Sequence, residues 1–150
     1  MALLDILAQR FLIGPRDPIA PRHLPGYVPF SKGLPAWWDA SRKEPVSGEV
    51  LGVHEFSPGD PSGAFIITRD GFGFPQNGVV EWIPFADFAS HKFPPKELAA
   101  GEVPVFTLIT RSGREVRFLF RTVRETFEFM AFVRAILTSV AAGQEPGRER

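Results

Sequence analysis

Apolar and polar residues alternate through the middle of the chain, from residue 47 to about residue 121. A period of two places successive side chains on opposite faces of an extended strand, so this pattern indicates strands with one buried face. The clearest case is Val116, Phe118 and Phe120, which alternate with charged residues, with Leu119 as the exception. The pattern predicts strands over 48–56, 64–68, 72–74, 79–83, 105–109 and 115–121. Residues 84–92 are expected to form a further strand, with a helical turn as the alternative.

Short turn sequences separate these strands. The dipeptides Asp70-Gly71 and Asn77-Gly78 are strong hairpin signals, because both central positions of the tight turn between two strands favour a positive φ. Residues 57–63 are rich in Pro, Ser and Gly and predict a loop, and residues 111–114 predict a further hairpin turn. After Pro94 and Pro95 interrupt the pattern, we expect one helical turn over 96–100.

Helical periodicity replaces the alternation after residue 121. Thr122 and Glu125 form a capping box, in which the hydroxyl and the carboxylate satisfy backbone amides at the start of a helix. The helix is predicted to run to about Ala141, and Gly143 ends it. About half of its circumference is apolar. The residues on this apolar arc are Val123, Phe127, Phe129, Met130, Val133, Ile136, Leu137 and Val140.

A short amphipathic helix is also predicted at the N-terminus, over residues 2–13. Leu3, Leu4, Leu7 and Phe11 lie on one stripe of this helix. Because a helix of this length is marginal alone, we expect it to dock on its own domain. Peripheral contact with a membrane surface, contact with a partner and exchange between two copies of the chain remain open alternatives.

Residues 14–46 form a proline-rich segment that contains seven prolines. Proline removes backbone donors, so we expect a stiff extended strap rather than a long helix or a central strand. Pro15, Pro18 and Pro21 repeat with the period of polyproline II, which leaves recognition by an aromatic groove as an alternative. We expect Trp37 or Trp38 to pin the strap to the domain. The chain thus divides into a helix and strap (1–46), a folded domain (47–142) and a polar tail expected to be disordered (143–150).

Four stretches of the folded region carry a resemblance to a known family: GAFIITRDGFGF, GVVEWIPFADF, VFTLITRSGREVRFLF and TFEFMAFVRAI. Together with the order of the elements, they resemble pleckstrin-homology-like domains, including the bacterial and GRAM-type members. The resemblance covers about two-thirds of the chain. It implies an α+β fold, in which six to seven short strands form a bent antiparallel barrel or sandwich and a C-terminal amphipathic helix caps one opening.

The sequence also departs from the pleckstrin pattern. The final helix has no tryptophan, and Phe129 and Phe132 are the nearest aromatic substitutes. A phosphoinositide reader needs cations in the loop after the first strand to bind phosphates. That loop, residues 57–63, contains one acidic residue and no basic one, which argues against inositide binding at the usual place.

Composition narrows the classes of function. The 17 basic and 17 acidic residues give a net charge of zero, so the positive excess that is typical of nucleic-acid binders is missing. The absence of cysteine excludes disulfides, cysteine-ligated metals and a thiol nucleophile. No signal peptide or membrane span is evident in the sequence, and we expect a cytoplasmic protein. The 15 phenylalanines predict an aromatic core.

Residues that could carry catalysis are dispersed. The histidines are His23, His54 and His91, and they do not have the spacing of a metal site. A nucleophile elbow is absent, and the carboxylates of Asp60, Asp70, Glu81 and Asp87 give no basis for an acid–base pair. We therefore expect no catalytic residue, no metal and no cofactor.

The leading hypothesis is a non-enzymatic binding or scaffolding domain with a protein partner. Its candidate interaction residues are Trp37, Trp38, Arg114, Arg117 and Arg121, because tryptophan and arginine contribute strongly to interfaces. A solvated face with cross-strand ion pairs would also explain the arginines. Two other classes remain open: a small β-barrel that carries an apolar or lipid ligand, and a hydrolase built from dispersed histidines and carboxylates.

Overall fold

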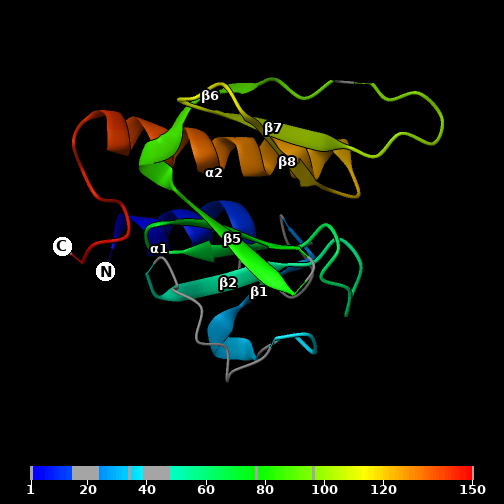
Figure 1. The fold of residues 1–150 in the computed structure, drawn as a ribbon, viewed down its shortest axis with the longest axis horizontal. Helices are drawn as coiled ribbons and strands as arrows, with labels where there is room; N and C mark the ends of the chain where they lie inside the picture. The colour runs from blue at the N-terminus through cyan, green and yellow to red at the C-terminus, as the bar shows by residue number, and fades with distance from the viewer. Residues whose placement is uncertain are drawn as a thin grey trace.

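Two antiparallel sheets form the body of the protein in a computed structural model, which describes residues 2–14, 24–33, 35–38, 48–76, 78–95 and 97–149. Sheet A has five strands in the order β1-β2-β3-β4-β5, and sheet B has three in the order β6-β7-β8 (Figure 1). The strands of sheet A are β1 Tyr27–Pro29, β2 Val50–His54, β3 Phe65–Thr68, β4 Gly71–Gln76 and β5 Val79–Pro84. The strands of sheet B are β6 Phe88–Lys92, β7 Val105–Thr110 and β8 Glu115–Leu119.

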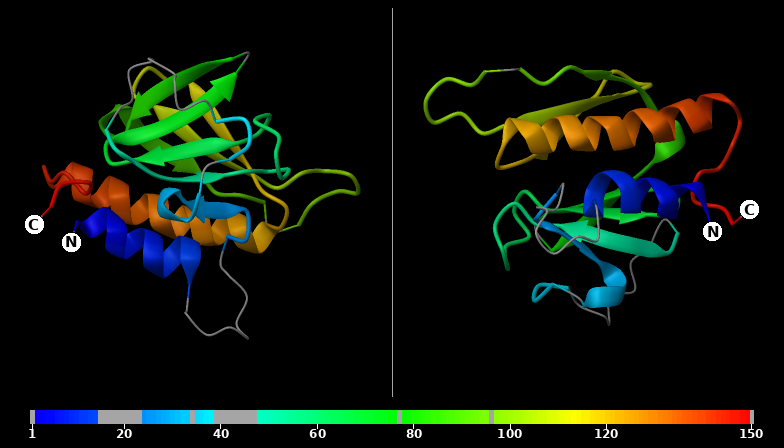
Figure 2. Two further views of the ribbon diagram at one scale, coloured as in Figure 1. Left: turned by 90° about the horizontal axis from the view of Figure 1, so that it is seen from below. Right: turned by 180° about the vertical axis from the view of Figure 1, so that it is seen from behind.

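Five helical segments accompany the strands in the described part of the chain. They are α1 Leu3–Leu7, the π-helix η1 Ala8–Ile13, the 3-10 helices η2 Phe30–Lys32 and η3 Phe85–Asp87, and α2 Val123–Ala141. Figure 2 shows α1 and η1 running beside α2, and Leu4, Leu7, Ala8 and Leu12 are buried in the main core. The predicted helix at residues 2–13 therefore docks within its own chain.

The predicted α+β class is confirmed, with two antiparallel sheets and a C-terminal helix. Seven of the eight described strands, β2 to β8, lie in the region for which six to seven were predicted, and the two sheets do not close into a barrel. The additional strand is β1, which arises in the proline-rich segment. It pairs only with β2, and Pro29 stands at its end, so the missing N–H of proline is tolerated at the edge of the sheet.

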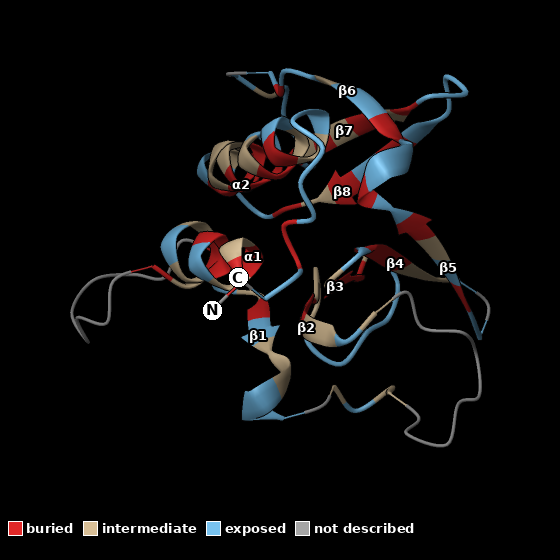
Figure 3. Ribbon diagram, turned by 90° about the vertical axis from the view of Figure 1, so that its left-hand side faces the viewer, coloured by how far each residue is buried: buried red, intermediate tan, exposed pale blue. Residues whose placement is uncertain are grey.

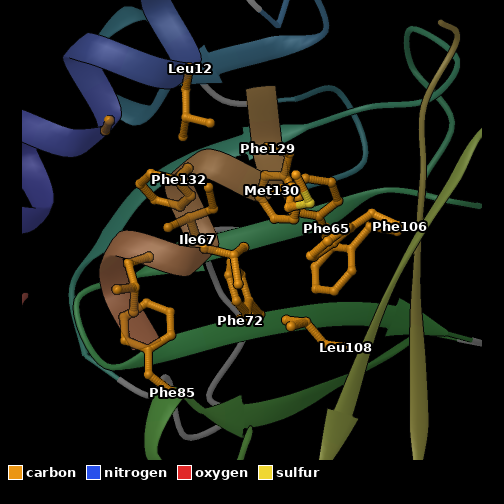
Figure 4. Packing of buried hydrophobic residues seen from close by; sticks show 14 of the residues in the cluster. Leu12, Phe65, Ile67, Phe72, Phe85, Phe106, Leu108, Phe129, Met130 and Phe132 are labelled. Atoms are coloured by element: carbon orange, nitrogen blue, oxygen red, sulfur yellow. The ribbon is translucent and has the colours of Figure 1, made fainter. Parts of the chain in front are cut away.

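Phenylalanine rings fill the space between the sheets and α2. Seven of the 15 phenylalanines are less than 2% exposed: Phe65, Phe72, Phe106, Phe118, Phe120, Phe129 and Phe132. Phe129 projects from α2 into the middle of this cluster, and its ring centroid lies 5.0 Å from that of Phe65 in sheet A and 4.9 Å from that of Phe118 in sheet B (Figure 4). The buried positions on α2 and on both sheets thus face one another (Figure 3).

A smaller apolar cluster lies on the opposite face of sheet A. Val53, Ile66 and Val80 are buried there, and the rings of Trp37 and Trp38 pack against them. Both faces of β3 are therefore covered, which explains why all four of its residues are buried. The expectation that a tryptophan pins the strap to the domain is confirmed.

The hairpin between β3 and β4 differs from its predicted form. Ile67 pairs with Phe72, so the turn lies at Arg69 and Asp70, one residue before the predicted dipeptide, and Gly71 is not among the glycines with positive φ. The hydroxyl of Thr68 accepts the backbone N–H groups of Asp70 and Gly71, at 3.2 and 3.0 Å. Glycine is needed at position 71 because a Cβ there would lie 2.2 Å from the carbonyl oxygen of Ile83.

The predicted capping box of the C-terminal helix is confirmed. The N–H of Glu125 donates to the Thr122 hydroxyl at 3.2 Å, and the Glu125 carboxylate accepts from the N–H of Thr122 at 2.9 Å. The same carboxylate accepts from the N–H of Arg121, also at 2.9 Å. Arg121 consequently belongs to the start of the helix, and the prediction that it shares the face of a strand with Arg117 is wrong, since β8 ends at Leu119.

Two further expectations about loops differ from the structure. The described residues 97–100 contain no helical turn. The tail expected to be disordered from residue 143 is instead packed, because Pro146 and Gly147 are buried and the Leu4 N–H donates to the Pro146 carbonyl at 2.7 Å. Gly147 lies so close to the backbone of Arg69 that a Cβ there would lie 1.9 Å from the Arg69 carbonyl oxygen.

Arg69 links the N-terminal helix to sheet A. Its guanidinium donates to both carboxylate oxygens of Asp5, at 3.2 and 3.1 Å, and to Glu49 at 3.1 Å. The polyproline repeat of Pro15, Pro18 and Pro21, together with His23, Pro45 and Asn77, lies outside the described residues. The alternative role of that repeat as a ligand for an aromatic groove therefore stays a prediction.

Replacing Phe129 by alanine should destabilise the protein strongly. The side chain is fully buried and contacts rings from both sheets, so Phe129→Ala is expected to lower the free energy of unfolding by about 4 kcal/mol. The measurement is urea denaturation followed by circular dichroism. The matched control is Phe93→Ala, whose side chain is 70% exposed and whose loss should change stability by less than about 0.5 kcal/mol. Equal effects of the two substitutions would contradict the central position of Phe129.

Candidate functional site

A cleft of about 640 Å³ opens between the end of sheet A and strand β8. Its volume falls within the range of about 300 to 1,000 Å³ that is typical of ligand clefts. The loop at residues 60–63, the beginning of β3, the end of β4 and the outer positions of β8 contribute to its walls. The lining residues include Trp37, Pro61, Phe74, Pro75, Arg117 and Leu119. The cleft is therefore mainly apolar, with one arginine on its wall.

Glu55 fixes one wall of this cleft. Its carboxylate accepts the indole N–H of Trp37 at 2.8 Å and the backbone N–H of Gly59 at 2.9 Å. The same oxygen thus holds the tryptophan and the loop after β2. Because both groups are bound to one carboxylate, Trp37 is held in place beside the cleft rather than left free to rotate.

Arg117 and Leu119 form the opposite wall. They occupy the outer positions of β8, whereas Val116 and Phe118 point into the core. The Arg117 side chain is exposed and forms no ion pair with any described residue. The neighbouring outer residue, Glu115, is bound to Lys92 of β6, and this contact lowers the pKa of its carboxyl. Arg117 is therefore a cation at the edge of an apolar cleft that forms no ion pair with a described residue, although its charge also helps to lower the pKa of Glu115.

The remaining predicted interaction residues lie outside the cleft. Trp38 packs edge-on against Phe30, with ring centroids 5.9 Å apart. The Arg114 guanidinium forms an ion pair with Glu81, which raises its pKa. The Arg121 guanidinium lies over the ring of Phe56, 5.2 Å from its centroid. Of the five predicted residues, the structure thus brings Trp37 and Arg117 together.

Sequence reasoning missed the apolar part of this site. Phe74 and Pro75 lie at the end of β4, beyond the residues of β4 that pair with β3. Both residues line the cleft. Leu119 did leave a signal in the sequence, because it interrupts the alternation on an otherwise polar strand face. An apolar residue at a position predicted to be exposed indicates a binding surface more directly than the tryptophan pair does.

The histidines and carboxylates that a hydrolase would need occupy separate surroundings. His54 lies in the core, and the ring of His91 packs against Phe106 with centroids 5.8 Å apart. Asp60 lies at the 640 Å³ cleft, whereas Asp87 lines a different cleft of about 420 Å³ beside β5. The side chains of His54, His91, Asp60 and Asp87 therefore do not converge on one site, and we find no geometry for acid–base catalysis among them.

His54 is a buried neutral base. Its ring is 2% exposed and stacks on Phe65 at a centroid distance of 4.9 Å and an interplanar angle of 17°. Its Nδ1 atom has no hydrogen-bond partner among the described residues. Burial, aided by the charge of Arg121, lowers the pKa of His54 to about 4. The imidazole is therefore uncharged near neutral pH, and protonation would place a cation within the aromatic cluster.

Comparisons and searches add no further site. Within the described ranges, no group of three or more His, Cys, Asp or Glu side chains could hold a metal ion. In the same part of the chain, no helix has both the length and the apolar character needed to cross a membrane. The chain matches no family model, and neither curated proteins nor solved structures show a match to it.

The protein should lose stability as the pH falls from 6.5 to about 4, the range in which His54 is protonated in the unfolded chain but not in the folded one. Below its ordinary pKa of 6.5 the imidazole binds a proton in the unfolded chain, but in the folded chain it does so only near pH 4. The free energy of unfolding should therefore fall by about 3 kcal/mol between pH 6.5 and pH 4 because of this residue alone. Urea denaturation across this range should show a shallower decline for His54→Leu than for the wild type. Parallel profiles would mean that His54 is not buried in its neutral form.

Proposed function

We propose that this protein is a non-enzymatic, cytoplasmic binding module that recognises a segment of another protein in the cleft beside β8. The proposal includes a pleckstrin-like relationship for the fold, which rests on the order of strands and the final helix. The partner segment would place an apolar side chain in the cleft and a carboxylate against Arg117. A protein of this kind would act as an adaptor or scaffold.

One observation carries the proposal, namely that Trp37 and Arg117 share an apolar cleft although 80 residues separate them in the chain. Tryptophan and arginine in a partly enclosed apolar setting are the residues that most often dominate the energy of an interface. Both are held by the fold, Trp37 through Glu55 and Arg117 through its strand. Such a preorganised surface lowers the entropy lost on binding.

The interior of the protein does not favour the alternative of an apolar carrier. Fully buried rings of seven phenylalanines occupy the space between the sheets and α2. A carrier would need that space for its ligand, as small β-barrels that hold a ligand provide. The open cleft borders the ring cluster at Phe65, which stays buried, and Asp60 and Arg117 place charges on its wall. A short peptide fits these properties better than a buried lipid.

The proposal predicts which peptides the protein selects. A random peptide library displayed on phage and panned against the purified protein should be enriched in sequences that combine an aromatic or aliphatic residue with Asp or Glu. Arg117→Glu should weaken the selected peptides by about tenfold or more, because a reversed charge replaces attraction by repulsion. Isothermal titration calorimetry with the synthesised peptides measures the change.

Arg124→Glu is the matched control for this experiment. Arg124 is also exposed, belongs to the first turn of α2 and does not line the cleft, so the same reversal of charge there should leave binding within about twofold. Selection of no peptides, or an equal loss of binding in both variants, would refute the proposed site.

A further inference from the structure

Among the described residues, strand β8 has one edge without a partner strand. It pairs with β7 alone, at the end of sheet B. The Phe120 N–H donates to the Pro104 carbonyl at 2.9 Å, and the Thr110 N–H donates to the Arg114 carbonyl at 2.9 Å. These two bonds show which residues of β8 direct their backbone groups toward β7. In an antiparallel pair, every second residue directs its N–H and C=O toward the partner strand. Phe118 and Val116 therefore bond to β7, whereas Arg117 and Leu119 direct both backbone groups away from it.

The free edge and the cleft coincide. Arg117 and Leu119, whose backbone groups point away from β7, are also the two residues of β8 whose side chains line the cleft. No backbone hydrogen bond between described residues reaches either of them from outside sheet B. On the facing wall, Pro75 has no N–H and so cannot complete a ladder from that side. A strand entering the cleft thus finds two donors and two acceptors on β8.

The other three edge strands of the two sheets are protected against such pairing. β1 has three residues and ends at Pro29. β5 ends at Pro84, and Glu81 in its middle is bound to Arg114 from the turn between β7 and β8. The register of β6 shifts between Phe88 and Ser90, and such a bulge disrupts the ladder. β8 has no proline and no register shift, so among these edges it is the one suited to accept a further strand.

Charge and polarity indicate what would pair there. In an added strand, side chains alternate between the face that carries Arg117 and the face toward Phe74, which lines the cleft and is partly exposed. Arg117 has no ion-pair partner among the described residues, so acidic side chains suit its face. Asp60, the acidic residue at the cleft, already accepts the Ser62 N–H at 2.8 Å. Apolar side chains suit the phenylalanine face.

We propose that the partner segment binds as an added β-strand along the free edge of β8, with acidic side chains facing Arg117 and apolar side chains facing Phe74. This inference rests on the proposed function and specifies its binding mode. Main-chain hydrogen bonds from Arg117 and Leu119 supply affinity, and the alternation of acidic and apolar residues supplies specificity. The ligand class is therefore an extended segment with a period of two, rather than a helix or a compact surface.

Backbone methylation of a defined peptide tests this mode without altering the protein. The probe is an acetylated and amidated seven-residue peptide in which glutamate alternates with valine, titrated against 15N-labelled protein. Two derivatives carry N-methyl groups either on every glutamate or on every valine. In a β-ladder the N–H groups of one set alone point toward β8, so one derivative should bind at least about tenfold more weakly and the other within about threefold of the parent. The antiparallel arrangement predicts that the glutamate set is the sensitive one.

The outcomes separate the two proposals. If the parent peptide binds, and binds more weakly to Arg117→Glu, but both methylated sets behave alike, the added strand is refuted while the binding cleft stands. If the parent peptide does not bind and a display library yields nothing, the proposed function itself fails. A peptide with lysine in place of glutamate should not bind, and equal binding of it would refute the acidic specificity. Sedimentation of the protein alone should show a monomer, since a dimer joined along β8 would make a second copy the occupant.

Discussion

The packing of Phe129 against rings from both sheets is the interaction on which the rest of the structure depends. Its ring lies 4.9 Å from Phe118 and 5.0 Å from Phe65, so one side chain of α2 is in contact with sheet B and with sheet A together. The capping box at Thr122 starts the helix directly after β8, which brings Phe129 to this place. The rings of Phe65 and Phe118 also contact each other directly, with centroids 5.0 Å apart, so α2 covers one side of two sheets that already touch (Figure 2).

The binding surface follows from that arrangement. Because α2 joins the sheets through side chains, the edge of β8 is left without a neighbouring strand. The end of β4 pairs with β5 but extends beyond β3, and the cleft lies between this free edge and the edge of β8. Trp37 and Arg117 are candidate binding residues because both line this cleft. The same residues on a closed barrel would be ordinary surface side chains.

The sequence allowed much of the fold to be predicted, because local patterns dominate it. Alternation located β7 and β8, and the Thr122 and Glu125 pair located the start of α2. Interactions between distant residues could not be predicted in this way. The position of the turn at Arg69 depends on contact between Gly71 and the backbone of Ile83, and burial of the tail depends on Leu4 and Arg69. Arg117 was predicted to belong to the site because it is an arginine. Its position on the open edge of β8 follows only from the pairing of the strands.

Amide hydrogen exchange along β8 in the free protein tests the central claim most directly. Val116 and Phe118 donate toward β7, so NMR should show their amides to be strongly protected. The amides of Arg117 and Leu119, which point to the open edge, should exchange almost as fast as those of an unstructured peptide. Protection of all four amides to the same degree would mean that another strand covers this edge and that the sandwich is closed.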